Sequence, residues 1–461
     1  MTDSREAIDI GNLVVVDRAV MQARQANEVW ERRKTANPER AADADPWRIH
    51  RKIAGKSVYD LLGARPAMAH ETELVAALRA HVLALILNRV TFETEVALAE
   101  KTVEPLGIVD LGRPRLISWR EAMRNVIGSP ARFEAAAYLE ALAECGPHVA
   151  SAAREHRARR AEAAHRLGAS NVHPGFSPGI AFAQSAARAL LDATEDVARD
   201  AVRSVRKRAE MQYDRASAVD VIAIATAREA IYGWPSHLTS RWLEDLFAAH
   251  VHGLAIVPVL PPAVVGASSF ARALEGFGYA LGRAIAYASP PFVLADDACA
   301  SGAHRVGVLF GGLVGTEIFH RRALDLGAEA AAKNARVLSR SLLIEARVRA
   351  AHILLGETET PSAALFEEVT FRVFGASLSK TLIGAWPLPR NDEPARFTAT
   401  LEFPSISRSF VERFDEDWFR NPRAFDSLRR ALPRLASATT DEAAAVEAAR
   451  QFSRAMERSL A

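Results

Sequence analysis

The chain has 461 residues, 49% of them hydrophobic, so it is long enough to bury a large core and exceeds the size of most single domains. A net charge of +2 with 25% charged residues gives no overall attraction to nucleic acid or to an anionic membrane. Only Cys145 and Cys299 are present, too few for a disulfide framework or a cysteine-rich zinc site. We therefore expect a cytoplasmic protein that binds neither nucleic acid nor membrane.

Most of the chain is predicted to be helical. Residues 1–60 are richer in charge and include a candidate mobile arm. Long runs rich in Ala, Leu, Arg and Glu, with apolar residues three or four positions apart, predict helices over 67–105, 119–166, 181–231 and 318–355. The tail after Thr439 predicts one last amphipathic helix.

Strand signals are few. The apolar stretch from Leu254 to Leu260 and the alternating stretch from Thr398 to Phe403 are the best candidates. The sequence therefore predicts a mainly α protein with a small β element.

A glycine-rich apolar run covers 302–315. Its glycines are Gly302, Gly307, Gly311, Gly312 and Gly315. The run lacks the terminal Lys and Ser or Thr of a phosphate loop, and no strand followed by the G-x-G-x-x-G spacing precedes it. It predicts two helices in close contact through small residues.

The segment from Ser269 to Gly282 resembles the active-site helix of a peptidase family. Its helix-packing residues match the F-H-E-F-G-H-A-L-H pattern at Phe277, Gly278, Ala280 and Leu281. On these residues the chain resembles the oligoendopeptidase/thimet oligopeptidase family of gluzincin zinc metallopeptidases. Shorter matches near 110–132, 166–171 and 414–424 follow in the family's order.

The resemblance fails at the residues that carry the family's chemistry. In HExxH the two histidines lie four residues apart on one helix face, so that both bind one zinc ion. Glu275 and Tyr279 occupy those positions here, and Gly276 replaces the Glu that activates water. Glycine has no side chain to accept a proton. The resemblance therefore implies a degenerate member with no catalytic residues.

Further losses follow downstream. The resemblance places Ala298 where the family has its third zinc ligand, a Glu, while Asp296 and Asp297 stand beside it as possible channel contacts. Phe371 and Phe374 occupy a stretch where the family has tyrosines that bind the tetrahedral intermediate. They keep the ring and lose the hydroxyl donor. The resemblance thus implies no zinc and no other cofactor.

The resemblance implies a large helical two-lobed fold with a central channel. It places an N-terminal arm and first helices over 1–66, an N-terminal lobe over 67–235 and a catalytic-like lobe over 236–461. In the active family the channel holds an extended peptide. The implied function is a non-catalytic scaffold for a peptide or protein partner, such as an active homologue.

Two alternatives remain. His250 and His252 form the only H-x-H, with Glu244 upstream, and on a strand both rings would point to one face as a metal needs. This pattern indicates a hydrolase with a rewired metal site. The other alternative is a helical assembly protein unrelated to peptidases.

Overall fold

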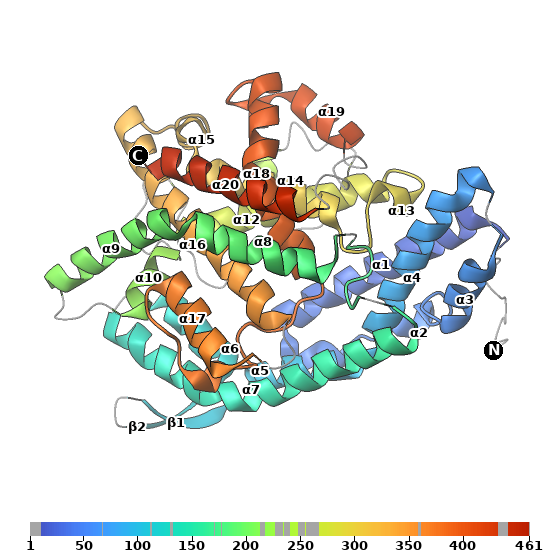
Figure 1. Cartoon of the computed structure of the whole chain (residues 1–461), viewed down its shortest axis with the longest axis horizontal. Helices are drawn as coiled ribbons and strands as arrows, with labels where there is room; N and C mark the ends of the chain where they lie inside the picture. Colours follow the sequence, from blue (N-terminus) through green and yellow to red (C-terminus); the bar gives the residue numbers. More distant parts are fainter. Residues whose placement is uncertain are drawn as a thin grey trace.

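The computed structural model describes residues 11–66, 68–110, 113–129, 132–169, 171–176, 178–212, 217–225, 234, 240–247, 254, 267–357, 361–431 and 441–460. These residues form a mainly α structure with one small sheet, as the sequence predicts (Figure 1). The first helices lie at one end of the molecule, and the long helix α16 runs through its middle.

The N-terminal helices are α1 (Leu13–Ala36), α2 (Trp47–His50), α3 (Lys56–Ala64), α4 (Thr72–Val90) and α5 (Phe92–Val103). Helix α1 begins at Leu13 because the Asn12 side chain accepts hydrogen bonds from the backbone N–H groups of Val14 and Val15. Its buried face carries three polar residues, Asp17, Arg24 and Asn27, among apolar ones. This face lies along the cavity described below.

The sheet is a hairpin that the sequence analysis did not predict. Strands β1 (Leu106–Asp110) and β2 (Arg113–Ile117) pair antiparallel and lead into α6 (Trp119–Gly128) and α7 (Arg132–Arg166). The short 3-10 turns are η1 (Pro38–Asp43), η2 (Ala69–Glu71), η4 (Gly312–Gly315), η5 (Lys380–Leu382) and η6 (Trp418–Arg420).

The strand predicted over Thr398 to Phe403 is wrong, because these residues lie inside helix α18 (Glu393–Phe414). Alternation indicates a strand only when its polar face meets water. Here the polar residues are buried too: the hydroxyls of Thr398 and Thr400 donate to carbonyls one turn back, and Glu402 pairs with Arg305. Of the other predicted strand, only Leu254 lies within the described residues.

The remaining helices confirm the predicted C-terminal helix and the predicted runs, except for residues of those runs that lie outside the described part of the chain, such as 226–231 of the run over 181–231. They are α8 (Gly179–Ala193), α9 (Glu195–Gln212), α10 (Ala218–Ala225), α11 (Ser240–Phe247), α12 (Ala267–Tyr287), α13 (Phe292–Ala295), α14 (Ser301–Gly311), α15 (Glu317–Ala323), α16 (Ala328–Gly356), α17 (Ala363–Phe374), α19 (Pro422–Ala431) and α20 (Glu442–Leu460).

The glycine-rich run forms helix α14 and packs closely on α12, as predicted. A Cβ at Gly278 would lie 2.6 Å from the Val306 carbonyl oxygen, and one at Gly282 would lie 2.7 Å from the Ala303 Cα atom. Any larger side chain at either position would push the two backbones apart. This contact fixes the helix that carries Glu275.

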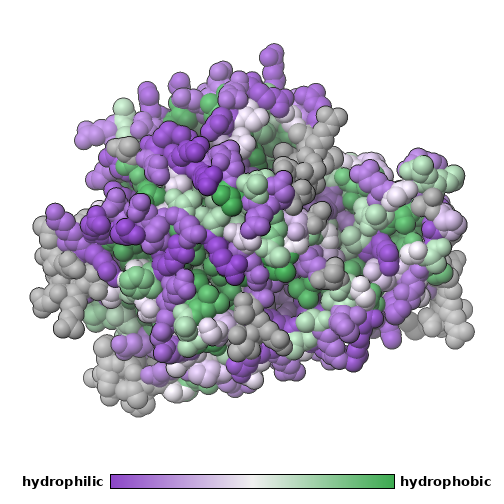
Figure 2. All heavy atoms as spheres, in the orientation of Figure 1, coloured by the Kyte–Doolittle hydropathy of each residue, from purple (hydrophilic) through white to green (hydrophobic). Residues whose placement is uncertain are grey.

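Two large apolar clusters form the core. One includes Leu13, Phe277 and Phe425, and the other includes Leu142 and Met456. Each cluster draws residues from before and after position 236, and the domain boundaries given above stay a prediction. On the face shown in Figure 2, hydrophilic side chains predominate and apolar ones form small patches between them.

No single described helix has both the length and the apolar composition to cross a membrane. The pair Ala69–Val90 and Phe92–Val103, bent by 55°, passes the same test when taken together. In this structure α4 contributes Leu78, Val82 and Leu85 to the core, which accounts for its apolar composition.

Candidate functional site

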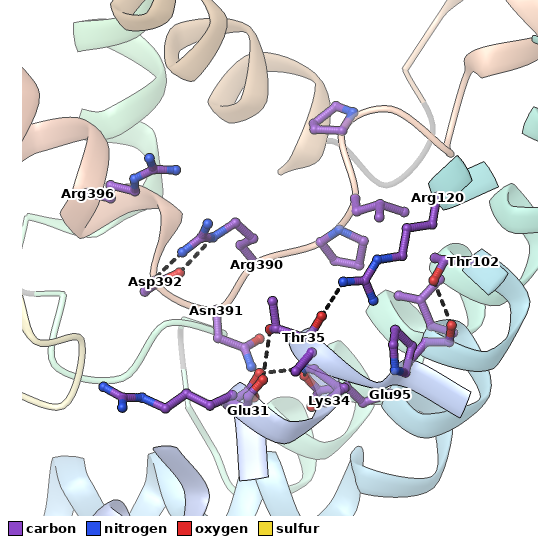
Figure 3. Close-up of a pocket in the computed structure, with 18 of the residues that line it drawn as sticks. Glu31, Lys34, Thr35, Glu95, Thr102, Arg120, Arg390, Asn391, Asp392 and Arg396 are labelled. Atoms are coloured by element: carbon purple, nitrogen blue, oxygen red, sulfur yellow. Dashed lines mark hydrogen bonds and ion pairs between the residues drawn. The ribbon is translucent and has the colours of Figure 1, made fainter. Parts of the chain in front are cut away.

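The main candidate site is a cavity of about 1680 Å³ that lies between the N-terminal helices and the second half of the chain. Helices α1, α5 and α6 line one part of it, and α12 and the segment 386–396 line another. Figure 3 shows Glu31, Lys34 and Thr35 of α1 in the same pocket as Arg390 and Asp392. The cavity is larger than the 300–1,000 Å³ or so of typical small-molecule pockets.

The lining carries charges of both signs. Nine of its described residues are Arg or Lys and seven are Asp or Glu. They are Arg24, Arg32, Lys34, Arg120, Arg124, Arg160, Arg272, Arg390, Arg396, Glu28, Glu31, Glu39, Glu95, Glu121, Glu275 and Asp392. Such a wall suits a polar ligand that carries both donors and acceptors.

Helix α12 places Glu275, Gly276 and Tyr279 in the lining of this cavity, as the resemblance implies for an active-site helix. Both carboxylate oxygens of Glu275 accept hydrogen bonds there. Its Oε1 accepts from Arg396 Nε at 3.0 Å, and its Oε2 accepts from Arg349 Nη2 at 2.5 Å. Burial alone would raise the pKa of this carboxyl, but the two guanidinium groups outweigh it and hold the pKa well below its usual range.

The ring centre of Tyr279 lies 4.8 Å from that of His304, which also lines the cavity, and the two rings are tilted by 41°. Burial raises the pKa of the Tyr279 hydroxyl far above its usual range, so this group stays a neutral donor. Ala298 lines the cavity as well and offers no ligand atom. A zinc ion binds deprotonated nitrogen, sulfur or oxygen donors. These residues do not fit it, because the Glu275 carboxylate is bound by arginines, the Tyr279 hydroxyl keeps its proton and Ala298 has no ligand atom.

The other predicted channel contacts lie outside the lining. Asp296 is buried and pairs with Arg283. Burial raises the pKa of Asp296 to about 7 even though Arg283 opposes this shift. Asp297 Oδ1 accepts from the backbone N–H groups of Cys299 and Ser301 and holds the start of α14. Both aspartates therefore support the cavity wall from behind.

Phe371 and Phe374 also lie away from the cavity. Phe371 is 56% exposed on the outer surface of α17, whereas Phe374 is buried against Trp386. The two rings lie in different surroundings. Neither of them lines the cavity that Glu275 and Tyr279 line. Trp386 itself lines the cavity, so Phe374 contributes only by supporting that ring.

The alternative metal ligands cannot be placed. His250 and His252 lie outside the described residues, as does the side chain of Glu244. Within the part of the chain that the structure describes, no three His, Cys, Asp or Glu side chains come together in a group able to hold a metal ion.

Comparison with known proteins gives little further guidance. No family model matches the chain, and no curated protein matches it. Among solved structures, the chain is similar to the crystal structure of oligoendopeptidase-F from Enterococcus faecium, with a TM-score of 0.40 and 9% sequence identity. The superposition covers 96% of this chain and 98% of that chain. At this TM-score and identity, the likeness carries no argument about activity.

Helix α1 contributes to the site, which the sequence did not predict. Arg24, Asn27, Glu28 and Glu31 all line the cavity, at the spacing of one helix face. A visible signal was present, because the apolar stripe of this helix (Val16, Val20, Ala23) continues into polar residues. A polar stretch on a buried face indicates a polar partner or a cavity.

A partly buried charge cluster on this wall joins α1 to α5. Lys34 Nζ lies 2.6 Å from Glu31 Oε2 and also bonds Glu95 (Figure 3). Burial, together with the Glu95 charge, raises the pKa of Glu31 to about 7. Burial lowers the pKa of nearby His156 to about 4, so that ring is neutral. Glu31 is thus a carboxyl that titrates near neutral pH inside the cavity.

A second wall is formed by the segment before α18. Arg390 pairs with Asp392 at 3.1 Å, and His304 Nε2 lies 3.2 Å from the same carboxylate. Burial alone would raise the pKa of Asp392, but Arg390 and His304 hold it well below its usual range. Asp392 is therefore ionised and already neutralised by the protein.

Proposed function

We propose that this protein is a degenerate relative of the oligoendopeptidase/thimet oligopeptidase family that binds an extended peptide in its cavity and leaves it intact. One observation carries the proposal. Glu275, Gly276 and Tyr279 face the cavity where an active relative would hold its metal and its base, and Glu275 has both oxygens bound by arginines. This helix face offers binding contacts and no water-activating group.

The cavity favours a peptide over a smaller ligand. Its volume of about 1680 Å³ exceeds what a drug-sized molecule fills. Its walls carry both cationic and anionic side chains, and a peptide backbone supplies both acceptors and donors to meet them. Trp119 and Trp386 add apolar surface for side chains.

The partner in this proposal is a free peptide or an exposed segment of another protein, an active homologue included. We place the protein in the cytoplasm, because its two cysteines are both free and buried in the structure. The proposed activity uses no cofactor.

One observation favours a second candidate function, a hydrolase that uses carboxyl groups. Glu31 has a pKa raised to about 7 and lies on the cavity wall beside the ionised Glu95. A carboxyl that titrates near the working pH suits general acid–base catalysis. On this alternative, Glu31→Gln abolishes peptide cleavage.

The full chain, incubated with a random heptapeptide mixture with free termini, tests both functions. Complexes are isolated by size exclusion and the peptides are identified by mass spectrometry after several hours. The proposal predicts an enriched set of peptides with intact masses, both in EDTA and in buffer supplemented with zinc. Peptide fragments in either buffer would contradict the proposal. Loss of those fragments with the Glu31→Gln variant would then assign the cleavage to Glu31.

A variant that fills the cavity provides the control. Ala36 lies in the lining and is exposed to the cavity, whereas Ala161 on α7 is exposed on the outer surface. Ala36→Trp should reduce peptide retention at least about tenfold, and Ala161→Trp should leave retention unchanged. Equal retention by both variants would place the bound peptide elsewhere.

A further inference from the structure

The buried face of α1 carries three polar residues, and only one of them has partners. Asp17 accepts from the backbone N–H groups of Phe292 and Val293, each at 3.0 Å, and so holds the start of α13. Arg24 and Asn27, two turns further along the same face, line the cavity instead. The Nε donor of Arg24 and the Oδ1 acceptor of Asn27 are both buried without a hydrogen-bond partner.

Arg24 is a buried cation without a counter-ion. Its side chain belongs to a residue only 9% exposed, and its Nε atom is buried with no hydrogen-bond partner. Among the residues that the structure describes, no carboxylate lies within 4 Å of its guanidinium. Asn27 is 7% exposed, and its Oδ1 atom is also without a partner. Burying a charge without a partner is unfavourable unless a ligand supplies one.

Glu28, one turn along α1 from Arg24, and Asp296 already pair with another arginine. Arg283 bonds Asp296 and lies 2.6 Å from Glu28, so these two acidic groups are committed to one guanidinium. Arg24 has no carboxylate within 4 Å among the described residues, so its own positive charge is left without an ion-pair partner there.

Three other groups near Arg24 are neutral. Burial, with the charge of Arg24, lowers the pKa of His81 on α4 to about 3. Burial raises the pKa of the Tyr279 hydroxyl and of the Cys299 thiol, so both keep their protons. None of these groups supplies the missing negative charge. The Tyr279 hydroxyl forms no hydrogen bond to a described residue and remains available as a donor.

We propose that Arg24, Asn27 and Tyr279 form a subsite for the carboxylate group of a ligand. A guanidinium donates two parallel hydrogen bonds to a planar carboxylate, and an amide and a phenol add neutral donors. The single unpaired charge of Arg24 matches a singly charged carboxylate better than a phosphate dianion. This inference rests on the proposed function in one respect, since the C-terminal carboxylate of the bound peptide is the source that the cavity favours.

Calorimetric titration of the full chain tests the subsite. The probes are an acetylated alanine–serine hexapeptide with a free C-terminal carboxylate, the same hexapeptide with a C-terminal amide, sodium succinate and inorganic phosphate. The free acid should bind at least about tenfold more tightly than the amide, since a hydrogen-bonded charge pair is lost. Arg24→Met should erase that difference.

Arg18→Met provides the matched control, because Arg18 is an exposed residue of the same helix and lies outside the lining. It should keep the preference for the acid, and circular dichroism should show all variants folded. Equal binding of acid and amide by the unaltered chain would overturn the subsite and leave the proposed function standing.

The remaining outcomes separate the two claims. Binding of succinate that depends on Arg24, with no binding of either hexapeptide, would support the subsite and count against peptide as the ligand. Binding of phosphate more tightly than succinate, again dependent on Arg24, would overturn the carboxylate assignment. Absence of binding by all four probes would overturn the subsite as well.

Discussion

Two arginines line the same cavity in opposite electrostatic circumstances. Arg396 donates to Glu275 at 3.0 Å and has Glu345 at 3.8 Å, so its charge is neutralised within the fold. Arg24 is as deeply buried and has no carboxylate within reach among the described residues. The comparison distinguishes Arg396, whose charge stabilises the fold, from Arg24, whose charge is available to bind a ligand. The first joins α12, α16 and α18, and the second faces open space.

The largest expected effect comes from removing the acidic partner in the paired region. Glu275→Gln would leave Arg349 and Arg396 with an uncompensated buried charge and should lower the free energy of unfolding by about 3 kcal/mol. Urea denaturation of the full chain measures this. Glu162→Gln is the control, since Glu162 is exposed and its ion pairs are worth about 0.5 kcal/mol. Equal losses in the two variants would contradict a special role for Glu275.

A second change tests the helix contact that holds Glu275 in place. In Gly278→Val the new side chain would meet the Val306 carbonyl, and we expect a loss of about 2 kcal/mol from forced separation of α12 and α14. The same substitution at Gly107 on β1, where a Cβ meets nothing within 4 Å, should cost less than about 0.5 kcal/mol. An unchanged free energy of unfolding in Gly278→Val would show that the two helices are not in close contact.

The third prediction concerns pH. Because the pKa of Glu275 is lowered in the folded protein, its stabilisation is complete above pH 4.5 and is lost as the pH falls below it. The stability difference between the unaltered chain and Glu275→Gln should therefore narrow below pH 4.5, by up to about 1.4 kcal/mol per pH unit. Denaturation curves at pH 6, 4 and 3 provide the measurement. A constant difference would mean that the carboxyl is not ion-paired.

The smallest effect is expected in the unpaired region. Arg24→Met replaces a buried charge that has no partner with an apolar side chain of similar length, so stability should be unchanged or rise by about 1 kcal/mol. Arg396→Met, by contrast, should lower it. Thermal denaturation of the two variants gives the comparison directly. A loss above about 2 kcal/mol in Arg24→Met would show that Arg24 serves the fold rather than a ligand.

The sequence predicted the parts of the fold that depend on local pattern. The long helices, the C-terminal helix and the close packing of the glycine-rich run on another helix were all visible in residue spacing and glycine content. The hairpin at 106–117 and the helix over Thr398–Phe403 were not, because each depends on what the rest of the chain buries. A buried threonine satisfied by its own helix looks the same in sequence as an exposed one in a strand.

The site was predicted in part for a similar reason. The resemblance located Glu275, Gly276, Tyr279 and Ala298, which the structure brings to one cavity. It did not locate Arg24, since the lack of a partner becomes visible only when Arg283, far along the chain, has taken Glu28 and Asp296. Pairing of charges across a fold follows from tertiary structure and leaves no local pattern.

The central claim is that the cavity binds its ligand without zinc chemistry. Elemental mass spectrometry measures it most directly, on full-length protein purified without a histidine tag and dialysed against excess zinc and then against metal-free buffer. We predict less than about 0.1 zinc per chain, because the residues of α12 at the positions where the resemblance implies zinc ligands do not fit the ion. A value near one zinc per chain would contradict the account, and His250 and His252 would then be the first residues to replace.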